Sequence, residues 1–89
     1  MKNAPSTEKV KVYTIRPCPY CDRAKQLLKQ RGVDFEEILV SQDDDAEWER
    51  LARLSGMQTM PQIFKGDRLI GGYSELAELD RVDQLKSLK

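Results

Sequence analysis

The spacing of the apolar residues changes beside the sequence Cys-Pro-Tyr-Cys, and this change restricts the possible folds more than any other feature of the chain. Residues 9–15 alternate polar and β-branched side chains, a period of two that is typical of a strand. From Pro19 onward the period becomes helical, with Cys21, Ala24 and Leu28 on one face. A strand that leads directly into a helix is the first half of a β-α-β unit, which requires a layered α/β fold.

The same alternation of strand and helix continues along the chain. The predicted segments are a first helix ending at Gly32, a strand over residues 33–40, a helix opened by Asp43–Asp45 and ended by Gly56, a hairpin of residues 62–64 and 68–71, and a helix from Ser74 onward. The apolar residues of the last helix recur at every third position and drift off one face, so we expect a break near Asp80. In the first strand, Lys9, Lys11 and Tyr13 should form the wetter face.

The order β-α-β-α-β-β-α predicts a four-stranded mixed sheet with helices on both faces. The two β-α units imply parallel pairing through right-handed crossovers, and the hairpin adds antiparallel strands. Three helices flank this sheet, or four if the last helix breaks. The 89 residues suffice for one domain. We expect residues 8–89 to form it and the polar residues 1–7 to be a flexible tail.

Composition excludes several classes of function. The chain has no histidine, so Ser-His-Asp triads, Cys-His pairs and histidine zinc sites cannot form within it. Its 15 basic and 15 acidic residues balance, and no overall field draws it to nucleic acid or to a membrane. It shows neither a signal-peptide pattern nor the roughly 20 apolar residues of a membrane span. We therefore expect a protein of the reducing cytoplasm, and we expect it to be a monomer.

The two cysteines occupy different environments in this pattern. Cys18 falls where the strand ends and the helix begins, because Pro19 suits the first helical position. The unpaired N–H groups of the helix start would stabilise a thiolate there, and such sites lower a thiol pKa from about 8.5 to roughly 3.5–7.5. Cys21 lies one turn later on the apolar face and should be buried. Positive charge from Arg16, and from Arg23 or Lys25, would further favour the Cys18 thiolate.

Three other roles are open to a pair of cysteines at this spacing. A tetrahedral zinc site needs four ligands, and two cysteines without histidine cannot supply them. A structural disulfide over two intervening residues would restrain the unfolded chain little, and a reducing compartment opposes it. Two inert buried cysteines are common in cores, but Cys18 before a proline at a helix start is poorly placed for burial. A C-x-x-C beside a β-α-β pattern therefore favours redox chemistry, with an exposed attacking thiolate and a sheltered resolving thiol.

Three segments in order resemble the dithiol glutaredoxins, small thioredoxin-fold proteins that use glutathione. They are "YTIRPCPYCDRAKQLL" at residues 13–28, "TMPQIF" at 59–64 and "IGGYSEL" at 70–76. The resemblance covers nearly the whole chain, from Val10 to Leu88. It implies a thioredoxin-like fold and an electron carrier for cell redox homeostasis, in which Cys18 and Cys21 are the catalytic pair.

The resemblance also implies a glutathione site. The implied contacts are Arg16, Tyr20, Gln58, Thr59, Met60, Pro61, Gly72, Tyr73, Ser74 and Glu75. Pro61 would be cis and face the sulfurs, and Met60 would present its backbone to glutathione as to an added strand. The segment from Gly72 would bind the γ-glutamyl end, with Glu75 on its ammonium, and Ser74 could also cap the helix.

The glycine carboxylate of glutathione has no obvious partner in this chain. Many relatives carry a basic residue three positions before the first cysteine, where this chain has Ile15, and another position that is often basic is Met57 here. Tyr20 would flank the peptide, and Arg16 or Gln58 could replace the missing charge. Lys25 is a further substitute.

The implied reaction is glutathione-dependent reduction of protein disulfides and glutathione mixed disulfides (deglutathionylation). Glutathione is the expected co-substrate, no metal is expected, and ribonucleotide reductase and peroxiredoxins are among the family's partners. One alternative is a carrier of an iron–sulfur cluster bridged by glutathione, which the stiff Pro19 and bulky Tyr20 disfavour. Another is a thioredoxin-like donor reduced by a flavoprotein reductase, although the thioredoxin sequence around the cysteines is absent.

Overall fold

The computed structural model describes residues 9–82 and Leu85, and the predicted tail at residues 1–7 lies outside this range. The elements are β1 (Val10–Thr14), α1 (Pro19–Gln30), β2 (Phe35–Leu39), α2 (Asp45–Ser55), β3 (Gln62–Lys65), β4 (Arg68–Gly71) and α3 (Tyr73–Arg81). This order is the predicted one. The second strand is shorter than the expected 33–40, and Val33 and Val40, which lie just outside it, are both buried. In the described part of the chain, no helix has the length and apolar character needed to cross a membrane.

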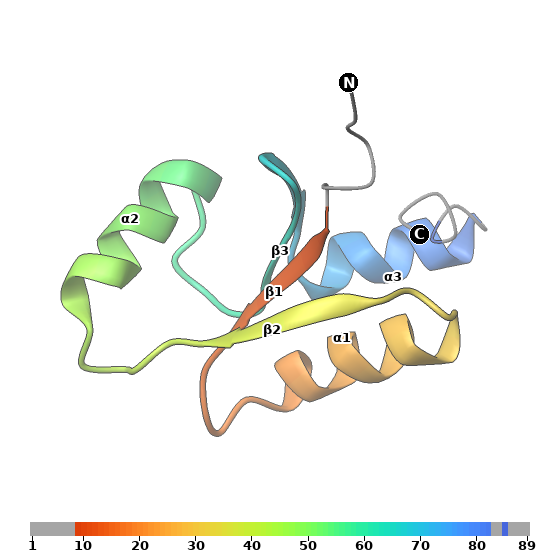
Figure 1. Ribbon diagram of the computed structural model, residues 1–89, viewed down its shortest axis with the longest axis horizontal. Coiled ribbons are helices and arrows are strands. Elements are labelled where there is room, and N and C mark those ends of the chain that lie inside the picture. The colour runs from red at the N-terminus through yellow and green to blue at the C-terminus, as the bar shows by residue number, and fades with distance from the viewer. Residues whose placement is uncertain (1–8, 83–84, 86–89) are drawn as a thin grey trace.

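The four strands form one mixed sheet in the order β2-β1-β3-β4. Strand β1 pairs in parallel with β2 and antiparallel with β3, which in turn pairs antiparallel with β4. Helix α1 is the crossover between the two parallel strands (Figure 1). The predicted α/β class, the mixed sheet and its flanking helices are confirmed.

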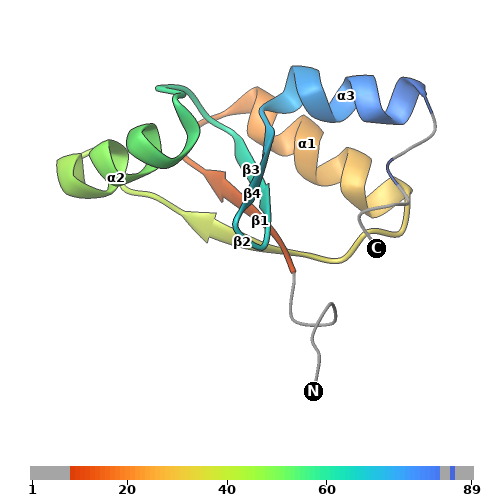
Figure 2. The same cartoon turned by 90° about the horizontal axis from the view of Figure 1, so that it is seen from above.

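Helices cover both faces of the sheet, with α1 and α3 together on one side and α2 on the other (Figure 2). The larger core cluster lies under α1 and α3, where the fully buried members include Val12, Leu28 and Leu76. A smaller cluster lies under α2, where Tyr13 packs edge-on against Phe64 with their ring centroids 5.7 Å apart. The expectation that Tyr13 belongs to a wetter face is wrong: it is 9% exposed, because α2 closes over that face.

Local signals set the ends of the first two helices. Arg31 caps the end of α1, and Gly32, the predicted end, follows it with φ 72°. The Asp44 carboxylate caps α2 by accepting the Glu47 N–H at 3.2 Å, and Gly56 ends the helix in the left-handed conformation. The acidic run and the glycine therefore act as predicted.

The last helix ends at Arg81, next to the break expected near Asp80. This end is tied to the end of α1, because Asp80 pairs with Arg31 at 2.6 Å. Beyond Arg81 the structure describes Val82 and Leu85, and Leu85 is buried against the larger cluster. The possible fourth helix therefore falls mostly outside the described residues.

Candidate redox site

Cys18 occupies the N-cap position of α1, and its sulfur meets the start of the helix. Its backbone is extended (φ −155°, ψ 95°), and its Sγ accepts a hydrogen bond from the Cys21 N–H at 3.2 Å. Pro19 is the first helical residue, where its missing N–H costs nothing. A backbone N–H and the positive end of the helix dipole therefore face the Cys18 sulfur.

The two sulfurs differ in exposure, as the helical pattern predicts. Cys21 is 1% exposed and packs in the interior, whereas Cys18 is half-buried and reaches the surface. In this structure they form a disulfide, with their Cα atoms 5.2 Å apart. The pair can thus close into an internal disulfide, and its outer sulfur is the one that another molecule can reach.

The segment before β3 lies opposite the disulfide. The Met60–Pro61 peptide bond is cis, and the Met60 carbonyl oxygen lies 3.9 Å from Cys18 Sγ. Pro61 is buried, while Gln58 and Thr59, earlier on the same loop, are exposed. A second cis bond, Arg16–Pro17, precedes the cysteines, and no feature of the sequence predicts it.

Sequence reasoning missed Gln62, which supports this loop. Its side chain is fully buried at the start of β3, and its Nε2 donates to the carbonyl oxygens of Met57 and Thr59, both at 3.2 Å. The available signal was an amide side chain directly before the apolar pair Ile63 and Phe64 of the predicted strand. Buried amides are normally hydrogen-bonded, so such a residue predicts a bonded neighbour.

Two tyrosines from different helices meet beside the cysteine pair. The ring of Tyr20, 55% exposed on α1, lies 5.7 Å from the ring of Tyr73 at the start of α3. The Arg23 guanidinium lies 5.2 Å from the Tyr20 ring centroid. The structure therefore brings Tyr20 and Tyr73 together, and it places the Arg23 charge over Tyr20.

The start of α3 differs from the expectation. Gly72 is the N-cap, and its N–H donates to Glu75 Oε1 at 2.7 Å. Ser74 is already inside the first turn, so the expectation that it caps the helix is wrong. The physical reason is that the helix begins at Tyr73, one residue before the serine, so Gly72 is the N-cap and its own N–H is satisfied by the Glu75 carboxylate.

A side chain at Gly71, the residue before this cap, would be strained and would displace Glu75. Gly71 has φ 130°, and a Cβ added there would lie 2.6 Å from Glu75 Cγ. We expect Gly71→Ala to lower the free energy of unfolding by about 2–4 kcal/mol, because backbone strain adds to the loss of the Glu75 hydrogen bond. The measurement is urea denaturation followed by circular dichroism.

The matched control is Gly56→Ala, which shares a positive φ of 71° but meets nothing within 4 Å. It should cost only the strain of the left-handed conformation, about 1–2 kcal/mol. Equal losses at the two glycines would show that the contact with Glu75 is unimportant.

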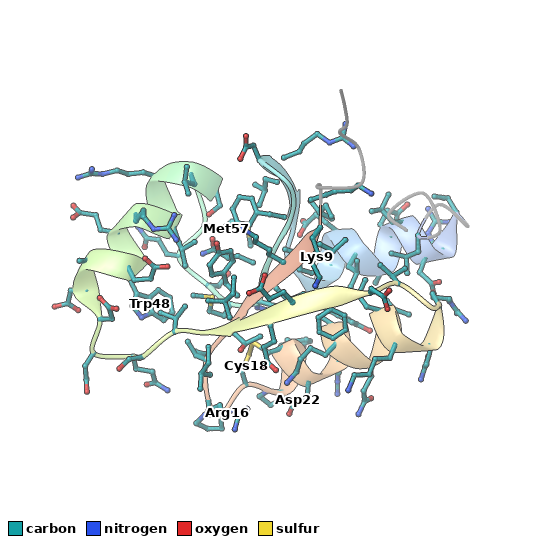
Figure 3. The ribbon with its side chains drawn as sticks, viewed as in Figure 1. Lys9, Arg16, Cys18, Asp22, Trp48 and Met57 are labelled. Atoms are coloured by element: carbon teal, nitrogen blue, oxygen red, sulfur yellow. A yellow bond between two sulfur atoms is a disulfide. The ribbon has the colours of Figure 1, made fainter. Side chains whose placement is uncertain are left out.

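A hollow of about 590 Å³ lies beside Cys18, between the loop after β1, the first turns of α1 and strand β2. It is lined by Ile15, Arg16, Pro17, Cys18, Pro19, Asp22, Lys25 and Glu37. This lining includes Arg16, one of the implied glutathione contacts, and Lys25, the further substitute for the missing charge. Figure 3 shows Arg16, Cys18 and Asp22 at the same end of the molecule. Because β1 ends at Thr14, Arg16 is free of the strand alternation and reaches this hollow, with its carbonyl bound by Gln42 at 2.6 Å.

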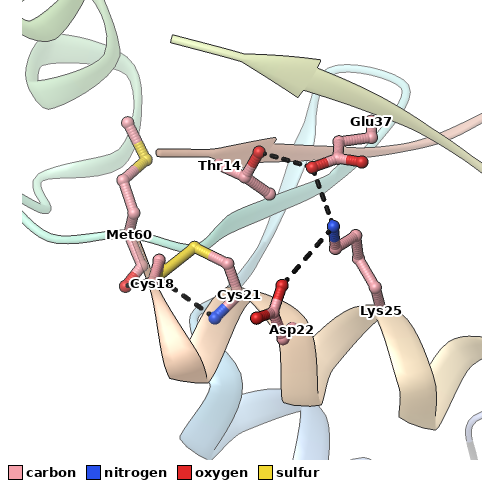
Figure 4. A network of polar contacts seen from close by, with 7 residues as sticks. All are labelled: Thr14, Cys18, Cys21, Asp22, Lys25, Glu37 and Met60. Carbon is pink, nitrogen blue, oxygen red and sulfur yellow. Dashed lines mark hydrogen bonds and ion pairs between the residues drawn. A yellow bond between two sulfur atoms is a disulfide. The ribbon is translucent and has the colours of Figure 1, made fainter. Parts of the chain in front are cut away.

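Lys25, expected to add positive charge near Cys18, is compensated by two carboxylates. Its Nζ donates to Glu37 Oε2 at 2.9 Å and lies 3.6 Å from Asp22 Oδ1 (Figure 4). The same Glu37 oxygen accepts the Thr14 hydroxyl at 2.8 Å. The hydrogen bond from Lys25 holds the pKa of the Glu37 carboxyl below its usual value, so Glu37 is charged at neutral pH. Sequence reasoning missed Thr14 and Glu37, because only the pairing of β1 with β2 brings them to α1.

The geometry defines a class of protein. A thioredoxin-like sheet carries a C-x-x-C pair at the first helix start, with a half-buried outer sulfur and a sheltered inner one. A pair in this arrangement exchanges electrons by opening and closing its disulfide. The protein is therefore a thiol–disulfide oxidoreductase of the thioredoxin fold.

Comparisons with known proteins identify the family. The glutaredoxin family model matches residues 10–70. The chain is 46% identical over 79 residues to the glutaredoxin of Pseudomonas aeruginosa, covering 89% of this chain and 93% of that protein. It is 44% identical over 71 residues to glutaredoxin 3 of Escherichia coli, covering 80% and 84% respectively. A crystal structure of a buckwheat glutaredoxin–glutathione complex superposes with a TM-score of 0.82 at 29% identity, covering 94% of this chain and 78% of the other. The chain belongs to the glutaredoxin family.

Proposed function

We propose that this protein is a glutathione-dependent thiol–disulfide oxidoreductase. The Cys18 thiolate attacks the glutathione sulfur of a mixed disulfide, which releases the substrate as a thiol. A second glutathione then attacks the Cys18–glutathione disulfide, so that oxidised glutathione leaves and the Cys18 thiolate returns. For a protein disulfide, Cys18 attacks first and Cys21 closes the internal bond, which two glutathione molecules reduce again.

The observation that carries this proposal is the position of the Cys18 sulfur at the start of α1. The sulfur accepts the Cys21 N–H at 3.2 Å, and the same interaction would stabilise a thiolate once the disulfide is reduced. Cys21 lies behind it, 1% exposed, as suits a resolving thiol. Support for glutathione as the co-substrate comes from family membership and from the buckwheat relative, which was solved as a glutathione complex.

We place glutathione beside Cys18, where α1, the loop before β3 and the start of α3 approach one another through the Cys18–Met60 and Tyr20–Tyr73 contacts. The Met60 backbone would pair with the cysteinyl part of the peptide, and Tyr20 and Tyr73 would flank it. The γ-glutamyl end would lie at Gly72, Ser74 and Glu75. The carboxylate of Glu75 would bind its ammonium, and the N–H of Gly72 already bound to Glu75 would hold that carboxylate in place.

The glycine carboxylate would be bound by polar groups near the cysteines. Gln58 and Thr59 are exposed on the loop before β3, and Arg16 is exposed beside Cys18. Neutral donors from Gln58 and Thr59, helped by Arg16, would replace the basic side chains that many relatives carry. We further propose that the protein works as a monomer in a reducing compartment such as the cytoplasm, where glutathione keeps such pairs reduced.

The test is a choice of electron donor. A glutathionylated peptide is supplied with NADPH and either glutathione with glutathione reductase or thioredoxin reductase alone. We expect NADPH consumption to depend on this protein in the first mixture and to stay at background in the second. Turnover with thioredoxin reductase alone would support the thioredoxin-like alternative. A brown protein with visible absorption after anaerobic purification would instead favour the iron–sulfur carrier.

A further inference from the structure

The hollow beside Cys18 contains a cluster of four charged side chains, of which the proposed function assigns a role to Arg16 alone. Two cations, Arg16 and Lys25, and two carboxylates, Asp22 and Glu37, share its lining with Cys18. They come from three different segments of the chain: the loop after β1, helix α1 and strand β2. The formal charges in this lining cancel, so the removal of any one of them leaves a net charge next to the sulfur.

Hydrogen bonds from residues of the sheet hold the Lys25 side chain of this cluster in place. Thr14, 1% exposed in β1, donates to Glu37 at 2.8 Å, and Glu37 in turn accepts from Lys25 at 2.9 Å. The Lys25 and Glu37 side chains are 19% and 27% exposed, which limits the solvent screening of their charges. Lys25 lies one turn after Cys21 on α1, and it lines the same hollow as Cys18.

The other elements packed around Cys18 present few free charges to it. The loop before β3 contributes the Met60 carbonyl at 3.9 Å, a dipole without a formal charge. On α3, one Glu75 oxygen is bound by the Gly72 N–H, and on α1 the Arg23 charge lies over the Tyr20 ring. The hollow is therefore where a change of charge acts on the sulfur most directly.

We propose that Lys25 and Glu37 are positioning residues that set the reactivity of Cys18 in opposite directions. Lys25 stabilises the Cys18 thiolate. Glu37 limits that stabilisation because its carboxylate compensates the Lys25 ammonium, and the Thr14 hydroxyl holds the Glu37 carboxylate in place. This inference rests on the proposed role of Cys18 as the attacking thiol. It deepens that proposal, because it names the residues that determine how much of the sulfur is a thiolate at neutral pH.

The direction of each effect follows from the charges. Lys25→Gln leaves two carboxylates near the sulfur and disfavours the thiolate, whereas Glu37→Gln leaves the ammonium less compensated and favours it. One unit charge at roughly 10 Å, with an effective dielectric constant between about 20 and 80, shifts a titration midpoint by about 0.3–1 pH unit. We therefore expect about two- to tenfold changes in thiolate fraction below the midpoint, with opposite signs in the two variants.

The experiment measures the alkylation of Cys18 by iodoacetamide in the fully reduced protein as a function of pH, with the modified cysteine located by mass spectrometry. The midpoint should rise in Lys25→Gln, fall in Glu37→Gln and return toward that of the unmodified protein in the double variant. The matched control is Asp80→Asn, which breaks the Arg31–Asp80 pair at the other end of α1, away from the hollow. Its midpoint should not move.

A structural role would give a different result. If the cluster only held α1 against β2, Lys25→Gln and Glu37→Gln would break the same contact. Both variants would then shift the Cys18 midpoint in the same direction, or not at all. Either result would show that the inference is wrong. Asp22→Asn is a second variant that should fold normally, because the Asp22 side chain is 69% exposed. It keeps the inference testable if Glu37→Gln does not fold. It should lower the midpoint as Glu37→Gln does, but by less.

The two proposals fail separately in this experiment. An ordinary alkaline midpoint for Cys18 in the unmodified protein would contradict its proposed role as the attacking thiolate. The differences between variants are measurable at any midpoint. A low midpoint that Lys25→Gln and Glu37→Gln leave unchanged would therefore overturn the inference alone.

Discussion

Cys18→Ser should abolish thiol–disulfide exchange, whereas Cys21→Ser should retain the reduction of glutathione mixed disulfides. A serine hydroxyl at the start of α1 is neither ionised at neutral pH nor able to form a disulfide, so the activity should fall by at least about a thousandfold. Cys21 is needed only to close the internal disulfide during the reduction of protein disulfides. The Cys21→Ser variant should therefore lose that activity and keep deglutathionylation.

Both activities are measured with the same coupled glutathione assay, once with a glutathionylated peptide and once with a peptide that contains an internal disulfide. Because Cys21 is 1% exposed, a serine there also places a hydroxyl in the core. Circular dichroism of each variant establishes that the fold is kept. An active Cys18→Ser protein together with an inactive, folded Cys21→Ser protein would reverse the assigned roles.

Leu28→Ala should destabilise the fold strongly, and far more than the same truncation of an exposed leucine. Leu28 is fully buried on α1 in the cluster that joins α1 and α3 to the sheet. Leucine-to-alanine changes at such positions cost about 3–5 kcal/mol, through lost burial and the cavity left behind. A domain of 89 residues has a total stability of roughly 4–13 kcal/mol, so this change would remove a large part of it.

The matched control is Leu54→Ala, also a helical leucine but 58% exposed on α2. It should change the free energy of unfolding by less than about 0.5 kcal/mol. Urea denaturation of both variants gives the comparison, provided that the dependence of the free energy on urea concentration is unchanged. Similar losses at Leu28 and Leu54 would show that the cluster under α1 and α3 is not the main core.

The order of the elements could be predicted because each depends on signals within a few residues. The alternation before Cys18, Pro19 at the first helical position and the acidic run before α2 all act through local backbone geometry and hydrogen bonding. The same local signals place one cysteine at a helix start and the other on its buried face. Segments that resemble a known family add the expected glutathione contacts, which spacing alone does not reveal.

The errors arise where a neighbouring element decides the environment. The alternation of Tyr13 with lysines in its strand predicts a wetter face, but α2 covers that face and buries the ring. Ser74 is a reasonable cap by residue type, yet the helix starts earlier, so Gly72 is the N-cap and Glu75 accepts its N–H. In both cases the local sequence allows two environments for the residue, and only the packing of the neighbouring elements decides which one it has.

The amino-acid sequence by itself determined the α/β alternation, the redox pair and the difference between its two sulfurs, because helix starts and hydrophobic periods are short-range properties. The tertiary structure alone decided what surrounds that pair. Thr14, Lys25 and Glu37 lie on three separate elements, and their hydrogen bonds exist only because β1 pairs with β2 and α1 packs across them. Electrostatic interactions depend on distance in space, and the chain brings those distances about only when it folds.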